Sequence, residues 1–98
     1  MVVKYKARFE KAFRRLAPSD QQRTLEAAGQ VERFFATRQA PEGLGLKKLF
    51  VVESLGAVCE ARVTLAMRVL FSVQPDLLTF LMVGDHDEVR RFIKSFRS

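Results

Sequence analysis

The sequence has very few residues that form crosslinks or bind metals. Its 98 residues include one cysteine, Cys59, and one histidine, His86. A single cysteine cannot form a disulfide within the chain, which is typical of proteins in a reducing, cytoplasmic compartment. A structural zinc site needs about four cysteine or histidine ligands, so one residue of each kind argues against such a site. We therefore expect neither a metal nor a cofactor.

Long hydrophobic runs are also missing. No apolar stretch approaches the ~20 residues that a membrane-spanning helix needs. The first nine residues, MVVKYKARF, alternate apolar and charged side chains, unlike a signal peptide. We therefore expect a cytoplasmic protein that makes no contact with a membrane.

The chain does contain enough apolar residues for one core, and it carries an excess of positive charge. Hydrophobic residues make up 48% of the sequence and include nine phenylalanines, which suffices for a single domain over residues 1–98. Lys and Arg number 17 and Asp and Glu 11, so the formal net charge is +6. A basic surface favours polyanionic partners such as nucleic acid, although it can equally be a merely solvated surface.

The N-terminal part of the sequence predicts a strand followed by two helices. Residues 2–9 alternate apolar and polar side chains, which predicts a half-buried strand. Apolar residues then follow helical spacing over residues 9–16, which predicts a short helix that ends near Pro18. In the stretch PSDQQ, Ser19 or Asp20 is expected to be the N-cap of a second helix.

The second helix should bury one apolar stripe, and a loop should follow it. Proline and glycine in QAPEGLG, residues 39–45, predict the loop. Residues 46–57 are harder to interpret, and residues 49–52 fit either a short strand or irregular structure. The expected stripe consists of Leu25, Ala28, Val31 and Phe35, joined by Ala27 and Phe34.

The C-terminal part predicts three strands and a final helix. Residues 58–65 and 67–73 alternate, and residues 77–83 form a continuous apolar run, typical of a strand covered on both faces. The fold class is therefore α+β, with an N-terminal strand, a two-helix hairpin, a three-stranded antiparallel meander and a C-terminal helix. Helical spacing gives that last helix an apolar stripe of Val89, Phe92, Ile93 and Phe96.

Polar residues should converge at one end of this meander. A tight turn between its first two strands places Arg62 opposite Arg68, and the next turn places Arg68 opposite Met82. His86 follows the last strand closely, and Glu60 shares the face of Arg62. We therefore expect the two arginines, the glutamate and the histidine to meet, provided that the register holds.

These side chains suit the cleavage of a phosphodiester. Arginine presents planar donors that match phosphate oxygens and can stabilise charge that grows in the transition state. Histidine gives or takes a proton near neutral pH. In RNA cleavage, Glu60 or His86 could act as the base and His86 as the acid. The structural alternative is that Asp85 or Asp87 caps the last helix with His86 beside it, and that Arg62 simply pairs with Glu60.

Three stretches together resemble the RelE/ParE superfamily of toxins from bacterial type II toxin–antitoxin systems. GLKKL, residues 45–49, resembles the segment that enters the sheet of that family. EARVTLAMRVLFSV, residues 60–73, resembles its pair of arginine-bearing strands, and LLTFLMVGDHDEVRRFI, residues 77–93, its last strand and terminal helix. With the order of elements, the resemblance covers nearly the whole chain and implies the RelE-like fold.

The resemblance implies a ribosome-dependent mRNA endonuclease, or mRNA interferase, that inhibits translation. His86 resembles the histidine of YafQ-like and YoeB-like members, Arg68 the strand arginine at the scissile phosphate, and Arg62 a second arginine. The RelE type has lysines near the position of Glu60, which an acidic residue replaces as base in some relatives. Many members carry a tyrosine near the C-terminus, whereas the only tyrosine here is Tyr5. The alternatives are a ParE-like inhibitor of DNA gyrase, which is not an enzyme, and a non-catalytic module that binds RNA or protein.

The resemblance also implies a protein partner. This is an antitoxin whose acidic, partly disordered segment wraps the toxin and folds on binding. Taken singly, any basic side chain can also be only a solvated charge. Those that could contact the antitoxin, mRNA or the ribosome are Lys47, Lys48, Arg90 and Arg91, together with Arg14, Arg15, Arg23, Arg33 and Lys94.

Overall fold

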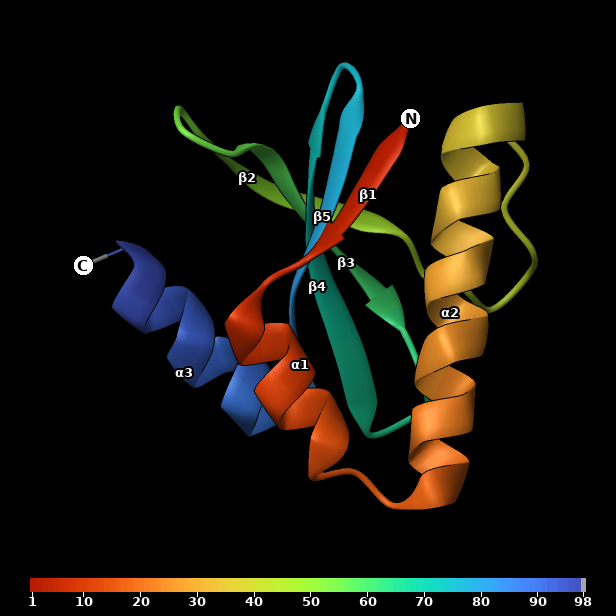
Figure 1. The fold of residues 1–98 in the computed structure, drawn as a ribbon, viewed down its shortest axis with the longest axis vertical. Helices are drawn as coiled ribbons and strands as arrows, with labels where there is room; N and C mark the ends of the chain where they lie inside the picture. The colour runs from red at the N-terminus through yellow and green to blue at the C-terminus, as the bar shows by residue number, and fades with distance from the viewer. Residues whose placement is uncertain (98) are drawn as a thin grey trace.

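The computed structural model describes residues 1–97, which form three helices and five strands (Figure 1). The predicted α+β class is confirmed. Within this described range, no helix is long and apolar enough to cross a membrane. In chain order the elements are β1 (Val2–Tyr5), α1 (Ala7–Arg14), α2 (Pro18–Thr37), β2 (Lys47–Val52), β3 (Gly56–Arg62), β4 (Met67–Gln74), β5 (Leu77–Asp85) and α3 (His86–Arg97).

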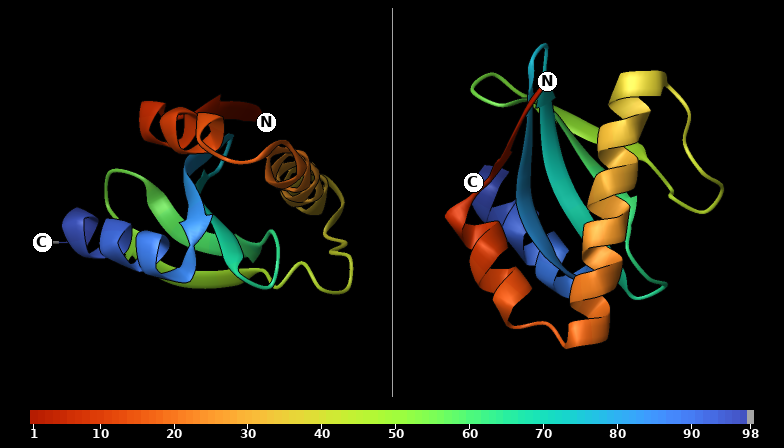
Figure 2. Two further views of the ribbon diagram at one scale, coloured as in Figure 1. Left: turned by 90° about the horizontal axis from the view of Figure 1, so that it is seen from below. Right: turned by 45° about the vertical axis from the view of Figure 1, so that its right-hand side comes forward.

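The strands form one sheet in the order β1-β5-β4-β3-β2. Strands β2 to β5 make an antiparallel meander, and β1 pairs in parallel with β5. Helices α1 and α2 cover one face of the sheet and α3 lies against the other (Figure 2, left). The meander therefore has one strand more than predicted, because β2 occupies much of the segment 46–57 that the sequence pattern leaves undecided.

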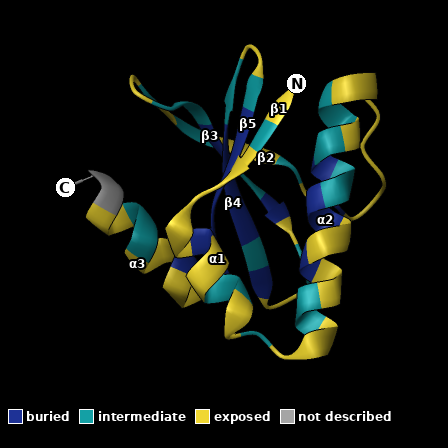
Figure 3. Ribbon diagram, viewed as in Figure 1, coloured by how far each residue is buried: buried dark blue, intermediate teal, exposed yellow. Residues whose placement is uncertain are grey.

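The central strands β4 and β5 are buried on both faces, as Figure 3 shows. On the side of α1 and α2, Phe71 and Phe80 are fully buried, and their ring centroids lie 6.0 Å apart. On the side of α3, Val89 packs in a second cluster with Leu70 and other side chains of the sheet. The covered strand predicted from the apolar run is thus confirmed. The side chain of Phe96, predicted for the same stripe of α3, lies outside the described residues.

The first strand is shorter than predicted because the first helix begins earlier. A strand through residue 9 is wrong, since β1 ends at Tyr5 and α1 begins at Ala7. The N–H of Lys6 donates to the carbonyl of Phe80 at 3.0 Å and ends the pairing with β5. Phe9 fits both an alternating and a helical pattern, and only the helix stacks its ring on Phe13, with the centroids 6.0 Å apart.

Helix α2 begins at Pro18, so the prediction of Ser19 or Asp20 as its N-cap is wrong. The N-cap position is Ala17, and no side chain caps it. Proline is favoured at the first helical position because it lacks the N–H that would find no partner there and its φ suits the helix. Asp20 instead lies in the first turn, where its carbonyl accepts a hydrogen bond from Thr24 Oγ1 at 2.8 Å.

At the N-terminal end of α2, the buried stripe is shifted by one residue from the predicted stripe. Leu25 is 53% exposed, whereas Thr24 is fully buried. Ala28 and Val31 are buried as predicted. Thr24 can take the place of an apolar residue because its hydroxyl is satisfied by the carbonyl one turn earlier.

The strand register determines which polar residues meet. Arg62 lies opposite Arg68, as predicted. Arg68 lies opposite Gly84 and not opposite Met82, so that expected pairing is wrong by two residues. One residue of this shift arises at the turn, where Gln74 pairs with Leu77. The other arises at a bulge after Leu70. At Arg68 the two shifts add up to two residues, so its side chain keeps its expected face.

Candidate functional site

The candidate site lies at the end of the sheet where the β3–β4 turn meets the start of α3, at the lower end of β4 in Figure 1. There Met67 pairs with Asp85 and Arg68 pairs with Gly84. Because α3 follows β5 without a loop, His86 is the first residue of the helix. The corrected register brings Arg68 closer to His86 along β5 than the predicted pairing with Met82 would.

Arg68 is held in place by a carboxylate and by the turn. Its Nε lies 3.4 Å from Glu60 Oε2, and the two side chains are only 20% and 21% exposed. Its Nη1 donates to the carbonyl of Thr64 at 2.9 Å and to the carbonyl of the preceding residue, Met67, at 3.0 Å. Charge-assisted hydrogen bonds of this kind are the strong ones, so the guanidinium has a fixed orientation.

Arg62 places a second positive charge beside Arg68. The two arginines are direct partners across β3 and β4, and like charges in that position repel. Glu60 pairs with Arg68, not with Arg62 as in the structural alternative drawn from the sequence. Lys47, on edge strand β2, lies opposite Glu60 and adds another exposed cation. One carboxylate therefore stands among three cations, an arrangement that attracts an anion such as phosphate.

Lys48 differs from Lys47 because it lies opposite Cys59, which belongs to the core beneath α2. Adjacent strand residues point to opposite faces, so Lys48 is on the other face of the sheet from Glu60. Burial raises the pKa of the Cys59 thiol, and the nearby charge of Lys48 partly opposes this change. Within residues 1–97, no three His, Cys, Asp or Glu side chains gather in a way that could hold a metal ion.

The start of α3 is fixed by reciprocal capping. Asp85 Oδ1 accepts the N–H of Glu88 at 2.8 Å, and Glu88 Oε1 accepts the N–H of Asp85 at 2.9 Å. This is a capping box, and Asp85 rather than Asp87 is its N-terminal member. A Cβ at Gly84 would lie 3.0 Å from Glu88 Oε1, so the absence of a side chain there leaves room for the glutamate to reach back.

We expect Asp85→Ala to lower the free energy of unfolding by about 1 kcal/mol, since it removes an N-cap. Asp87→Ala is the matched control, because it removes the same charge from the same turn without breaking a capping bond, and it should cost at most about 0.5 kcal/mol. Urea unfolding of both variants measures the difference. Equal losses would show that charge near the helix start, and not the cap, is what matters.

His86 is exposed and has a hydrogen-bond partner that sequence reasoning missed. Its Nε2 lies 2.7 Å from Nη2 of Arg90, one helical turn further on. The spacing i,i+4 places the two side chains on one side of the helix and is the signal that could have revealed the pair. Glu60, Arg62 and Arg68 therefore form one cluster, while His86 stands at the adjoining helix start, bonded to Arg90.

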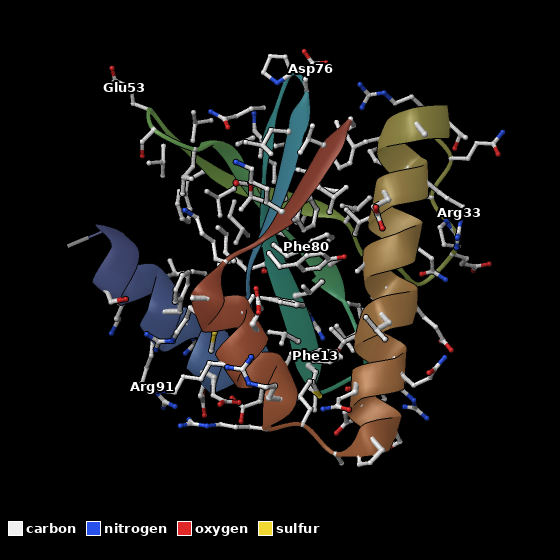
Figure 4. All side chains as sticks on the ribbon, in the orientation of Figure 1. Phe13, Arg33, Glu53, Asp76, Phe80 and Arg91 are labelled. Carbon is white, nitrogen blue, oxygen red and sulfur yellow. The ribbon has the colours of Figure 1, made fainter. Side chains whose placement is uncertain are left out.

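A basic groove of about 670 Å³ separates α1 from α3. Arg8 and Lys11 from α1 and Arg15, which follows that helix, line the groove with Arg91 from α3, which is labelled in Figure 4. The guanidinium of Arg8 lies 5.7 Å from the ring centre of Phe92. Of the groove's cations, Arg15 and Arg91 are among those predicted from the sequence to bind a partner, whereas Arg8 and Lys11 are not. The apolar residues that line it are Ala12, Leu16, Met82, Val83 and Phe92.

Comparison with solved structures finds the same overall fold in several toxins. No family model and no curated protein matches the sequence. The structure is similar to RelE in the RelE–RelB complex of Pyrococcus horikoshii, with 25% identity, 85% of this chain and 91% of that chain covered, and a TM-score of 0.65. It is also similar to YafQ of Escherichia coli (15% identity, 90% and 96% covered, TM-score 0.61) and to the RelB–RelE antitoxin–toxin complex of Methanococcus jannaschii (14% identity, 90% and 95% covered, TM-score 0.62). This chain therefore has the fold of the RelE-like toxin superfamily.

Proposed function

We propose that this chain is the toxin of a type II toxin–antitoxin system and that it cleaves mRNA on the ribosome. The observation that carries this proposal is the pairing of Arg62 with Arg68 across β3 and β4, with Glu60 bound to Arg68, beside the helix that begins with His86. An inhibitor that acts by binding alone does not need a titrating group at that place. The likeness to RelE and YafQ toxins supports the same conclusion.

Each residue of the site has a role in the cleavage of a ribose-phosphate chain. Arg68 and Arg62 hold the non-bridging oxygens of the scissile phosphate and stabilise the charge that grows on them. The imidazole of His86 accepts the proton of the 2′-hydroxyl and then donates a proton to the leaving 5′-oxygen. Glu60 keeps the guanidinium of Arg68 in position, because its carboxylate forms an ion pair with Nε at 3.4 Å while Nη1 donates to the turn.

Induced expression in a bacterial host tests the proposal. We expect growth arrest within minutes, and mapping of mRNA 5′ ends should show new ends inside codons of translated messages. Arrest with intact mRNA and broken chromosomal DNA would instead identify a gyrase inhibitor. Unimpaired growth at high expression, with RNA binding that weakens as salt rises, would identify a non-catalytic module.

We further propose that the basic groove between α1 and α3 binds the acidic segment of an antitoxin. Its apolar lining and its cationic rim suit a segment that carries apolar residues on one side and carboxylates on the other. The related toxins of Pyrococcus horikoshii and Methanococcus jannaschii were solved with their RelB antitoxins.

Charge reversal in this groove should weaken that complex. We expect Lys11→Glu with Arg15→Glu to reduce affinity for the acidic product of the neighbouring reading frame about tenfold, equivalent to about 1.4 kcal/mol. Lys4→Glu with Arg23→Glu is the control, because both residues are exposed outside the groove and the change in net charge is identical. Calorimetric titration of both double variants decides the matter, and an equal loss would point to overall charge instead of the groove.

A further inference from the structure

The hydrogen bond between Arg90 and His86 determines which imidazole nitrogen carries the hydrogen. An arginine guanidinium has only donors, so in this 2.7 Å contact Nη2 of Arg90 must donate and Nε2 of His86 must accept. A neutral imidazole has one N–H, so the hydrogen is on Nδ1. A neutral histidine in water prefers the opposite arrangement, with hydrogen on Nε2.

The surroundings of the pair hold this contact in place. The capping box between Asp85 and Glu88 fixes the backbone on both sides of His86. Arg90 follows at i,i+4, which is the spacing at which helical side chains meet. The next residue, Arg91, points toward α1 and lines the basic groove, so the two adjacent arginines serve different surfaces. Both His86 and Arg90 are exposed, so substrate can reach them.

The contact has a consequence for the chemistry proposed above. While Arg90 donates to Nε2, that lone pair cannot accept a proton from a substrate hydroxyl. A phosphodiester is the better acceptor for the guanidinium, because it carries a full negative charge and two oxygens that match the planar donors of arginine, whereas Nε2 is a single neutral acceptor. Arg68 pairs with Gly84, two residues before His86, so an RNA phosphate held there lies beside the start of α3 and would compete with Nε2 for the N–H groups of Arg90.

We propose that Arg90 is a positioning residue that occupies Nε2 of His86 in the free protein and releases it when an RNA phosphate binds. This proposal rests on the proposed function of His86 in RNA cleavage. On release, Nε2 takes the proton of the 2′-hydroxyl, the 2′-oxygen forms a bond to phosphorus, and the bond from phosphorus to the 5′-oxygen breaks. The imidazolium returns a proton to the 5′-oxygen, so the products are a 2′,3′-cyclic phosphate and a 5′-hydroxyl.

Nuclear magnetic resonance of the imidazole tests the proposal directly, because His86 is the chain's only histidine and gives a single set of signals. In protein labelled with ¹⁵N at histidine, and at a pH where the ring is neutral, the ¹⁵N shifts should show hydrogen on Nδ1 in the wild type. Arg90→Met should move the hydrogen to Nε2, whereas Arg90→Lys should keep much of the wild-type pattern because an ammonium also donates. Arg91→Met is the control, since it removes the neighbouring charge but no bond to His86.

A second measurement adds a 2′-O-methyl RNA oligonucleotide, which cannot be cleaved because it has no free 2′-hydroxyl. We expect the wild-type signals to move toward those of Arg90→Met, while the signals of that variant change little. Identical tautomers in the wild type and Arg90→Met would overturn the proposal, and so would binding without a tautomer change or an absence of binding. Cleavage assays are a separate test, because the tautomer can be present in a protein that cuts no RNA.

Discussion

His86→Ala is expected to lower the rate of mRNA cleavage by about 10²- to 10⁴-fold, which is the usual contribution of a general acid or base. The effect should be large because the chain contains no second histidine to replace it. In cells, the variant should permit growth at expression levels at which the wild type arrests it. Primer extension on translated messages, compared at equal protein levels, measures the change in cleavage.

The loss of cleavage activity in His86→Ala should come without a loss of folding stability. His86 is exposed, and its backbone stays within the capping box of Asp85 and Glu88. The free energy of unfolding, measured by urea titration, should therefore change by no more than about 0.5 kcal/mol. Lys4→Ala, which removes an exposed cation of β1, is the control for general charge effects and should leave cleavage nearly unchanged. Full toxicity in His86→Ala would remove the histidine from the proposed mechanism.

Phe80→Ala should destabilise the protein by about 3–5 kcal/mol, as is usual when a buried aromatic ring is truncated. Phe80 is fully buried in β5, the strand that pairs with both β1 and β4. Its ring lies 5.2 Å from that of Tyr5, 5.8 Å from that of Phe9 and 6.0 Å from that of Phe71, measured between centroids. The substitution therefore weakens contacts with β1, α1 and β4 together. Since a domain is stable by only about 5–15 kcal/mol, a large part of the stability should disappear.

Urea unfolding of three variants checks this expectation. Leu65→Ala is the control, because this leucine is 89% exposed and its loss should cost less than about 0.5 kcal/mol. Phe80→Leu should fall between the two, since it keeps most of the apolar volume. A cost below about 1 kcal/mol for Phe80→Ala would mean that the core of the sheet can close around the missing ring.

The sequence pattern predicts the architecture well where one periodicity dominates. The continuous apolar run of β5 and the pairing of Arg62 with Arg68 are confirmed by the structure. Errors occur where two signals overlap. Phe9 fits both a strand and a helix, and Pro18 starts α2 one residue before the polar residues that usually cap helices. Local spacing cannot decide such cases, because the packing of distant residues does.

The site was harder to predict than the fold, because its geometry depends on single-residue details. The turn at β4–β5 and the bulge after Leu70 each add one residue to the register, and no composition signal marks the bulge. The pairing of Glu60 with Arg68 instead of Arg62 is diagonal across two strands, which a list of opposite residues does not reveal. The basic groove needs α1 and α3 side by side, a contact between segments far apart in the chain.

Purified protein added to ribosomes programmed with a defined mRNA gives the most direct test of the central claim, that the arginine cluster and His86 cleave RNA. The wild type should produce a cut within a codon of the bound message, with a 2′,3′-cyclic phosphate on one side and a 5′-hydroxyl on the other. Arg68→Ala should reduce the rate by about 10²- to 10³-fold, as expected for the loss of a group that stabilises transition-state charge. A message that stays intact with the wild-type protein, or is cut equally well by Arg68→Ala, would contradict the assignment of this site.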